Sequence, residues 1–244
     1  GIAGVVPAIS LNYSSSAGNG PAGQGWNIGG LSAITRCRQT LHQDGVAEPI
    51  TFTSSDRFCL DRQRLILVEG TYGASGSSYK TEIDSYAKVE ALGGEPGHPD
   101  YWKVSRKDGS TTFYGEAGKD KASELKGWTT EDKKSGKVAS WSIRQSLDSV
   151  GNQIVFLYTN DSDGIRISDV QYAFAINTSS HNASIQFEYE SRDDQRKDYM
   201  AGYYIPVKQR LTKVISKNKV DGTWKEVRSY QLKYRDQETT DKLS

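Results

Sequence analysis

A glycine-rich segment at residues 14–30 carries the spacing with the most specific chemical meaning in the sequence. It reads SSSAGNGPAGQGWNIGG, and Gly18, Gly20 and Gly23 have the spacing G-x-G-x-x-G. This spacing, between a strand and a helix, is typical of turns that bind the pyrophosphate of a dinucleotide. Asp44 lies at about the distance at which such sites place an acid that binds the ribose.

The residues around these glycines argue against a nucleotide site. Pro21 follows the second glycine, and its ring has no N–H to offer to a phosphate. Gly25, and the glycines that follow it to residue 30, oppose the helix that the site requires. The segment therefore predicts a glycine-rich bend between strands, with Trp26 and Ile28 capping the core beneath it.

A pair of glutamates, Glu188 and Glu190, has the E-x-E spacing that ADP-ribosyltransferases use. Such an enzyme also needs a catalytic arginine and a Ser-Thr-Ser strand upstream. Ser140-Trp141-Ser142 is a poor substitute for that strand, and no arginine precedes it in a convincing context. Because catalysis requires several groups in one geometry, we interpret the pair as solvated residues on one face of a strand.

The histidines do not form a recognisable site. His42, His98 and His181 stand alone near turns, without metal-ligand spacing, and no G-x-S-x-G elbow supplies a nucleophile. We expect each of them to be a surface residue. The sequence therefore predicts no catalytic residues, no cofactor and no metal site.

Two cysteines, Cys37 and Cys59, both lie in strand-like segments. One interpretation is a disulfide between neighbouring strands, as in secreted proteins. The other is a pair of buried free thiols that pack as small apolar groups. The sequence leaves both interpretations open.

Composition favours a β protein with many turns. The chain has 244 residues, 24 glycines, 14 tyrosines and one methionine. A net charge of +1 removes the electrostatic case for binding nucleic acid. No apolar run approaches the ~20 residues that span a bilayer. The chain lacks an initiator methionine and a signal-peptide pattern, so we expect a fragment of a longer protein.

Short alternating segments between turn signals predict an all-β, mostly antiparallel fold with an open or sandwich-like sheet. Asp108-Gly109 and Asp221-Gly222 predict hairpins. The candidate strands are Ala8–Ser14, Ser32–Cys37, Asp56–Leu60, Arg64–Glu69, Tyr79–Ile83, Tyr86–Ala91, Tyr101–Arg106, Ser110–Tyr114, Ser140–Ser146, Gln153–Thr159, Ile165–Tyr172, Ser184–Glu190, Tyr203–Lys208, Leu211–Lys217 and Lys225–Arg235.

Charge marks one long connection in this pattern. Residues 118–137 are rich in charge and poor in apolar side chains, and they predict an exposed loop with one helical turn near Ser123–Leu125. No low-complexity linker separates halves of different composition, so we expect residues 1–244 to form a single domain.

The N-terminal third of the chain resembles a known family. Pro7–Gly20, Gly23-x-Gly25-Trp26 and Leu31–Arg36 are similar to the opening of the SpvB-like region. That region is shared by the Salmonella virulence plasmid B protein, by B components of Tc insecticidal toxins, and by large bacterial proteins with Rhs/YD repeats. The signature residues are Gly18, Asn19, Gly20, Gly23, Gly25 and Trp26. Arg62 departs from the pattern, because glycine is frequent there, which puts a tight left-handed turn in doubt.

The resemblance implies a structural role. In Tc toxins the region is antiparallel β-structure that helps to build a hollow shell around a toxic C-terminal segment. By this resemblance the chain is a non-catalytic part of a secreted bacterial toxin, and its partners are the rest of its polypeptide and other toxin subunits. The alternatives are a β-sandwich that binds carbohydrate or a receptor, favoured by the tyrosine and tryptophan content, and an ADP-ribosyltransferase.

Overall fold

Antiparallel β-strands dominate the structure, a computed structural model. It describes residues 4–83, 85–116, 122–130, 133–175, 178–194 and 198–234, with the backbone alone at 127–130 and 133–136. The single helix within these ranges is the short α1 (Leu41–Asp44), which ends on Gly45 in the left-handed conformation. The prediction of a mostly antiparallel β fold is confirmed.

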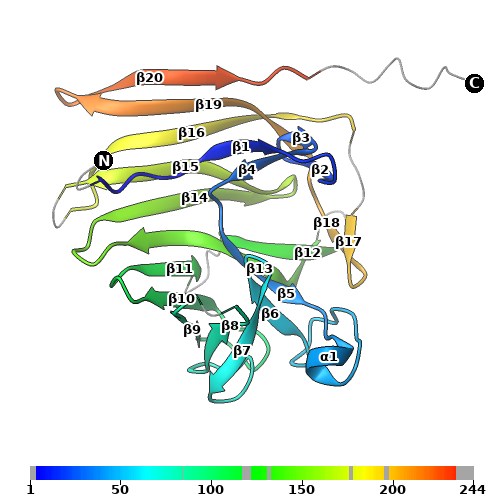
Figure 1. Ribbon diagram of the computed structural model, residues 1–244. Coiled ribbons are helices and arrows are strands. Elements are labelled where there is room, and N and C mark those ends of the chain that lie inside the picture. The colour runs from blue at the N-terminus through cyan, green and yellow to red at the C-terminus, as the bar shows by residue number, and fades with distance from the viewer. Residues whose placement is uncertain are drawn as a thin grey trace, which may run out of the picture.

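Eight strands close into a barrel, in the lower half of Figure 1. In ring order they are β11 (Thr111–Gly115), β10 (Tyr101–Arg106), β9 (Ala87–Leu92), β8 (Ser78–Thr81), β7 (Gln63–Glu69), β6 (Arg57–Leu60), β5 (Ala33–Cys37) and β13 (Lys133–Leu147). The ring closes because β13 pairs with β5 along its middle and with β11 toward its C-terminal end.

Barrel closure corrects the expectation of an open or sandwich-like sheet. Closure depends on contacts such as Phe113 opposite Gln145, between strands that are far apart in the sequence. Period-two alternation is the same in an open and a closed sheet, so the local pattern carries no signal for closure.

The sheet continues beyond the barrel from the C-terminal part of β13. The added strands are β14 (Gln153–Asp161), β15 (Gly164–Phe174), β16 (His181–Ser191), β19 (Gln209–Val220) and β20 (Thr223–Gln231). They form the upper half of Figure 1, with β20 at the edge. Within the described ranges no strand pairs with the outer side of β20, and all its residues are exposed.

A short second layer lies across one face of this extension (Figure 1). It consists of β1 (Ser10–Tyr13) paired with β4 (Trp26–Gly29), and the small hairpin of β2 (Asn19–Gly20) and β3 (Gly23–Gln24) lies between them. Side chains from this segment, among them Leu11 and Ile28, pack against the core. The N-terminal segment therefore covers part of the apolar face of the sheet.

Aromatic side chains fill the barrel. The ring of Trp102 lies 4.8 Å from that of Phe58 and 5.7 Å from those of Tyr79 and Trp141, centroid to centroid. These edge-to-face and tilted contacts pack aromatic rings against one another in the interior of the barrel. The same core cluster runs on through the extension as far as Leu211 in β19.

Both predicted Asp-Gly hairpins are confirmed. Asp108-Gly109 lies between β10 and β11, and Asp221-Gly222 joins β19 to β20. At the second turn both residues have positive φ, 50° for Asp221 and 78° for Gly222. This is the backbone of a type I′ turn, whose twist matches that of the flanking strands.

The charged segment 118–137 is not the exposed loop that its composition predicts. Residues 117–121 and 131–132 lie outside the described ranges, but β12 (Glu124–Thr130) pairs with the start of β13. Ser123 and Glu124 are fully buried, and in place of the predicted helical turn β12 begins at Glu124, directly after a turn at Ser123. The reason is tertiary, because the barrel fixes β13 and thereby provides a pairing partner for a polar segment. β12 also contacts a small hairpin of β17 (Asp198–Met200) and β18 (Tyr203–Ile205).

Candidate functional site

The glycine-rich segment forms a hairpin that is fastened to the end of β16. Arg192 is 2% exposed, and it donates to the carbonyl oxygen of Gly20 (2.9 Å) and to the side-chain oxygen of Asn19. Its Nε atom also donates to the carboxylate of Asp194, 2.8 Å away. Hydrogen bonds from Arg192 and Asn19 hold the pKa of the Asp194 carboxyl well below its usual range.

Close packing explains two of the signature glycines. A Cβ atom on Gly23 would lie 2.8 Å from the ring of Tyr234, and one on Gly25 would lie 2.7 Å from the ring of Tyr13. Both residues also have positive φ. Two residues before Gly23, the carbonyl oxygen of Pro21 accepts a hydrogen bond from the Leu211 N–H of β19 (2.7 Å). The prediction of a bend between strands is confirmed, because the element that directly follows Gly25 is the strand β4 and not a helix.

The expected core role of Trp26 is wrong. Its side chain is 42% exposed and lies beside Tyr13, which is 63% exposed, with a centroid separation of 5.4 Å. Ile28, two residues further along β4, does pack against the core. The segment therefore presents an exposed aromatic pair at the end of the second layer, next to the β2–β3 hairpin.

The E-x-E pair lies on the polar face of β16. Glu188 and Glu190 are exposed, and Glu190 accepts a hydrogen bond from Arg210 of β19 at 2.7 Å. Phe187, which precedes Glu188 and points to the opposite face of β16, is buried. Trp141, at the centre of the weak Ser-x-Ser match, is buried inside the barrel. The solvated interpretation of the glutamates agrees with this geometry.

The histidines differ in their surroundings. His42 is exposed on α1, and His181 stacks near Trp224 with a centroid separation of 5.2 Å. His98 is half-buried, and its Nδ1 atom lies 3.1 Å from a guanidinium nitrogen of Arg36. The expectation of a surface residue is confirmed for His42, whereas His98 and His181 are both half-buried. Within the described residues, no group of His, Cys, Asp and Glu is arranged to hold a metal.

Arg36 is the buried charge that organises this side of the barrel. It donates to the carbonyl oxygens of Val138 (2.6 Å) and Gly97 (2.8 Å) and pairs with Asp56 at 3.0 Å. Burial lowers the pKa of Arg36, and the charge of Asp56 opposes that effect. Its guanidinium carbon lies 5.7 Å from the ring centroid of Trp141. One side chain thus joins β5, β13 and two loops, which the sequence did not indicate.

A polar cleft of about 400 Å³ lies beside this network. Its titratable lining residues are Glu95, His98, Asp100, Glu124, Lys126 and Lys137. Burial, Arg36 and Lys137 lower the pKa of His98, so its ring stays neutral near pH 7. Because the Arg36 guanidinium can only donate, Nδ1 of His98 accepts and the proton lies on Nε2. This histidine is arranged to hold a loop in place.

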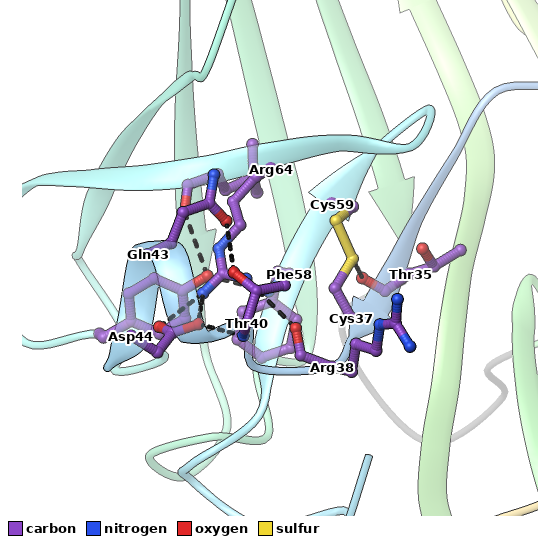
Figure 2. The surroundings of a disulfide bond; sticks show 11 residues. Thr35, Cys37, Arg38, Thr40, Gln43, Asp44, Phe58, Cys59 and Arg64 are labelled. Carbon is purple, nitrogen blue, oxygen red and sulfur yellow. Dashed lines mark hydrogen bonds and ion pairs between the residues drawn. A yellow bond between two sulfur atoms is a disulfide. The ribbon is translucent and has the colours of Figure 1, made fainter. Parts of the chain in front are cut away.

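A disulfide lies next to a second buried cluster (Figure 2). Cys37 of β5 and Cys59 of β6 are joined, with their Cα atoms 6.0 Å apart. Nearby, the carboxylate of Asp44 accepts hydrogen bonds from Arg64 (2.5 Å) and Arg57 (2.8 Å). Burial alone would raise the pKa of Asp44, but the Thr40 N–H and both guanidiniums lower it. The carboxylate of Asp44 is therefore ionised and is used in structural hydrogen bonds with Thr40, Arg57 and Arg64.

Comparison with known proteins decides the family. The model of the "Salmonella virulence plasmid 65kDa B protein" family matches residues 1–188, most of the chain. The chain belongs to this SpvB family. The glycine-rich hairpin and the barrel lie inside the matched range. No curated protein sequence matches the chain.

Solved structures share the fold at low sequence identity. The N-terminal domain of the effector SpvB from Salmonella typhimurium has a TM-score of 0.71 and 18% identity, with 96% of each chain covered. A TcdB2–TccC3–Cdc42 structure has a TM-score of 0.73 and 18% identity over 95% of this chain. A Tc holotoxin pore from Photorhabdus luminescens has a TM-score of 0.74 and 18% identity over 93% of this chain. The chain spans 14% of the TcdB2–TccC3 chain and 13% of the holotoxin chain.

Proposed function

We propose that this SpvB-family chain is a non-catalytic structural domain of a secreted bacterial toxin. In this proposal it forms part of a β-shell that encloses or delivers a C-terminal toxic effector, and its partners are the rest of its polypeptide and other toxin subunits. The observation that carries the proposal is the family match, together with a fold shared with Tc toxin assemblies. A disulfide suits a protein that functions outside the cytosol.

The outer edge of the sheet supports a shell. β20 has an unpaired side within the described residues, and Trp224, Val227 and Tyr230 on it are exposed. An exposed edge with apolar side chains is a template for pairing with another strand. In a shell, the next strand of the wall would cover this edge. Across the described ranges no helix is long and apolar enough to span a membrane.

Hydrogen exchange tests the shell proposal. The backbone amides of β20 that point outward are expected to exchange fast in residues 1–244 alone and slowly in a longer polypeptide that contains them. Amides of β16, which is paired on both sides, serve as the internal control. Protease resistance of a C-terminal segment in the longer polypeptide is the second measurement. If the β20 amides exchange equally fast in both proteins, the β20 edge no longer supports the shell proposal.

The exposed aromatic pair favours one other function, a module that binds carbohydrate or a receptor. Tyr13 and Trp26 present adjacent rings to solvent, and such rings stack on sugars. A glycan array tests this function, with Trp26→Ala as the variant and Trp224→Ala as a matched exposed tryptophan. Binding that Trp26→Ala alone abolishes would favour the module over the shell.

A direct assay addresses catalysis. We expect no transfer of label from radioactive NAD, because Glu190 is paired with Arg210 on an exposed strand face. Labelling that Glu190→Ala abolishes would contradict the non-catalytic proposal.

A further inference from the structure

An apolar groove of about 450 Å³ lies between the second layer and the outer strands of the sheet. Phe187, Val214 and Tyr230 form its floor, and they come from three neighbouring strands, β16, β19 and β20. The register places Phe187 opposite Val214 and Val214 opposite Tyr230, so all three project from one face. Tyr230 is 55% exposed, so the floor is open at its outer end.

One wall of the groove is the unpaired edge of β1. Residues of β1, and none of β4, line this groove, whereas β4 lines a separate cleft on its opposite side. The Ser14 N–H donates to the Gly25 carbonyl oxygen (2.9 Å), and residues two apart on a strand direct their backbone groups alike. Leu11 therefore directs its N–H and C=O away from β4, toward the groove. Within the described residues, β1 pairs with β4 alone.

The outer rim of the groove is positively charged. Arg228 of β20 pairs with Ser216, which lines the groove, and Lys225 follows on the same side of the sheet. Arg228 donates to the hydroxyl of Tyr230 (3.1 Å), and neither cation has a carboxylate partner among the described residues. The strand at the other wall, β1, carries no charged residue.

We propose that this groove binds an extended peptide segment of a second protein chain, which adds a third strand to the β1–β4 layer. The segment has an apolar residue at every second position, facing Phe187, Val214 and Tyr230, and an acidic residue beside Arg228. Backbone groups of Leu11 provide the hydrogen bonds, as in other cases of strand addition at a sheet edge. A free edge above an apolar floor suits a strand better than a small apolar molecule, which leaves the edge unpaired. The inference is independent of the shell proposal.

Fluorescence polarisation with a synthetic peptide tests the strand geometry. The probe is a short labelled peptide with valine at alternate positions, threonine between them and glutamate near one end. N-methylation of the backbone is placed either on the valines or on the threonines, because only one set of N–H groups faces β1. We expect one methylated peptide to bind about tenfold more weakly and the other to bind as the parent peptide does. Equal binding of both methylated peptides would overturn the proposal.

Variants of the full chain test the floor and the rim. Tyr230→Asp places a charge at the exposed end of the floor and is expected to weaken peptide binding about tenfold. Val150→Asp, in the exposed turn before β14, is the matched control with no expected effect. Arg228→Glu is expected to weaken binding of the glutamate peptide and to favour a lysine peptide instead.

Two other occupants of the groove, a small apolar molecule and a second copy of the chain, would give different experimental results. If the parent peptide fails to bind while Tyr230→Asp abolishes binding of the apolar dye anilinonaphthalene sulfonate, the groove takes a small apolar molecule and the proposal is wrong. If the chain self-associates with increasing concentration and Tyr230→Asp abolishes that association, a second copy is the occupant and the proposal is equally overturned. Circular dichroism of each variant confirms that the fold is retained.

Discussion

Arg62 shows at the residue scale how a departure from the family pattern is accommodated. The sequence put a left-handed turn in doubt there, yet Asp61 and Arg62 both have positive φ, 47° and 72°, in the tight turn between β6 and β7. Asp61 is held in place because its carboxylate accepts hydrogen bonds from the Ser32 hydroxyl (2.6 Å) and the Ala33 N–H (3.0 Å). The left-handed backbone conformation is therefore retained at Arg62, although it is energetically unfavourable for a residue with a Cβ atom.

Replacing Arg62 by glycine should therefore stabilise the protein. A left-handed conformation costs a residue other than glycine about 1–2 kcal/mol. Glycine avoids this cost in the folded state, but its greater conformational entropy stabilises the unfolded chain and offsets part of the gain. We expect Arg62→Gly to raise the free energy of unfolding by about 1 kcal/mol in urea denaturation. Arg62→Ala, which keeps a Cβ atom, is the control and should give no such gain. A loss of stability in Arg62→Gly would show that the arginine side chain contributes more than its backbone costs.

His98 should make stability depend on pH. The folded protein keeps it neutral, because burial, Arg36 and Lys137 lower its pKa, with Glu95 and Asp56 opposing. The unfolded chain takes up a proton near the ordinary value of about 6.5. The unfolded state thus binds more protons below that pH, and stability falls as pH decreases from there.

Comparison of His98→Gln with the wild type isolates this effect. The variant keeps an acceptor for Arg36 and cannot titrate, so its free energy of unfolding should fall less than that of the wild type between pH 7 and pH 5, a range of about two units around the ordinary histidine value. His42→Gln, on exposed α1, is the matched control and should keep the wild-type slope. Identical slopes for wild type and His98→Gln would remove His98 as the cause.

At the scale of elements, the sequence predicts what is decided locally. The Asp-Gly hairpins and the alternating faces of β16 follow from residues that are close together in the chain. On β16, for example, Phe187 is buried and its neighbour Glu188 is exposed, as the alternation predicts. β12 and Glu124 were missed, because their strand depends on a partner that the barrel provides. The buried Arg36 was missed for the same reason, since its acceptors come from three separate segments.

The disulfide is the covalent link between two barrel strands. Cys37 and Cys59 are 22 residues apart in the sequence. Closing a loop of that length in the unfolded chain corresponds to about 3 kcal/mol in the chain-entropy model. We expect reduction by dithiothreitol to lower the free energy of unfolding by about that amount, and thiol labelling of the denatured, unreduced protein to detect no free cysteine. The double variant Cys37→Ala/Cys59→Ala should not respond to dithiothreitol. Labelling without reduction would instead favour the two buried thiols.

For the whole molecule, one strand belongs to both parts of the sheet. β13 closes the barrel by pairing with β11 and starts the extension by pairing with β14. The core cluster is continuous from Trp102 inside the barrel to Leu211 in β19. The barrel and the extension therefore lack separate cores, which supports the prediction that the chain is a single domain.

Unfolding experiments test that prediction. Fluorescence of the buried tryptophans reports on the barrel, and exchange of the β16 amides reports on the extension. Both probes should give one coincident transition in urea. Leu211→Ala, at a fully buried position of β19, should lower the stability measured by both probes equally, by about 2–5 kcal/mol. The matched variant Leu41→Ala, exposed on α1, should change neither probe. If Leu211→Ala shifts the β16 amides and leaves the tryptophan transition in place, the extension unfolds by itself and the chain contains two units.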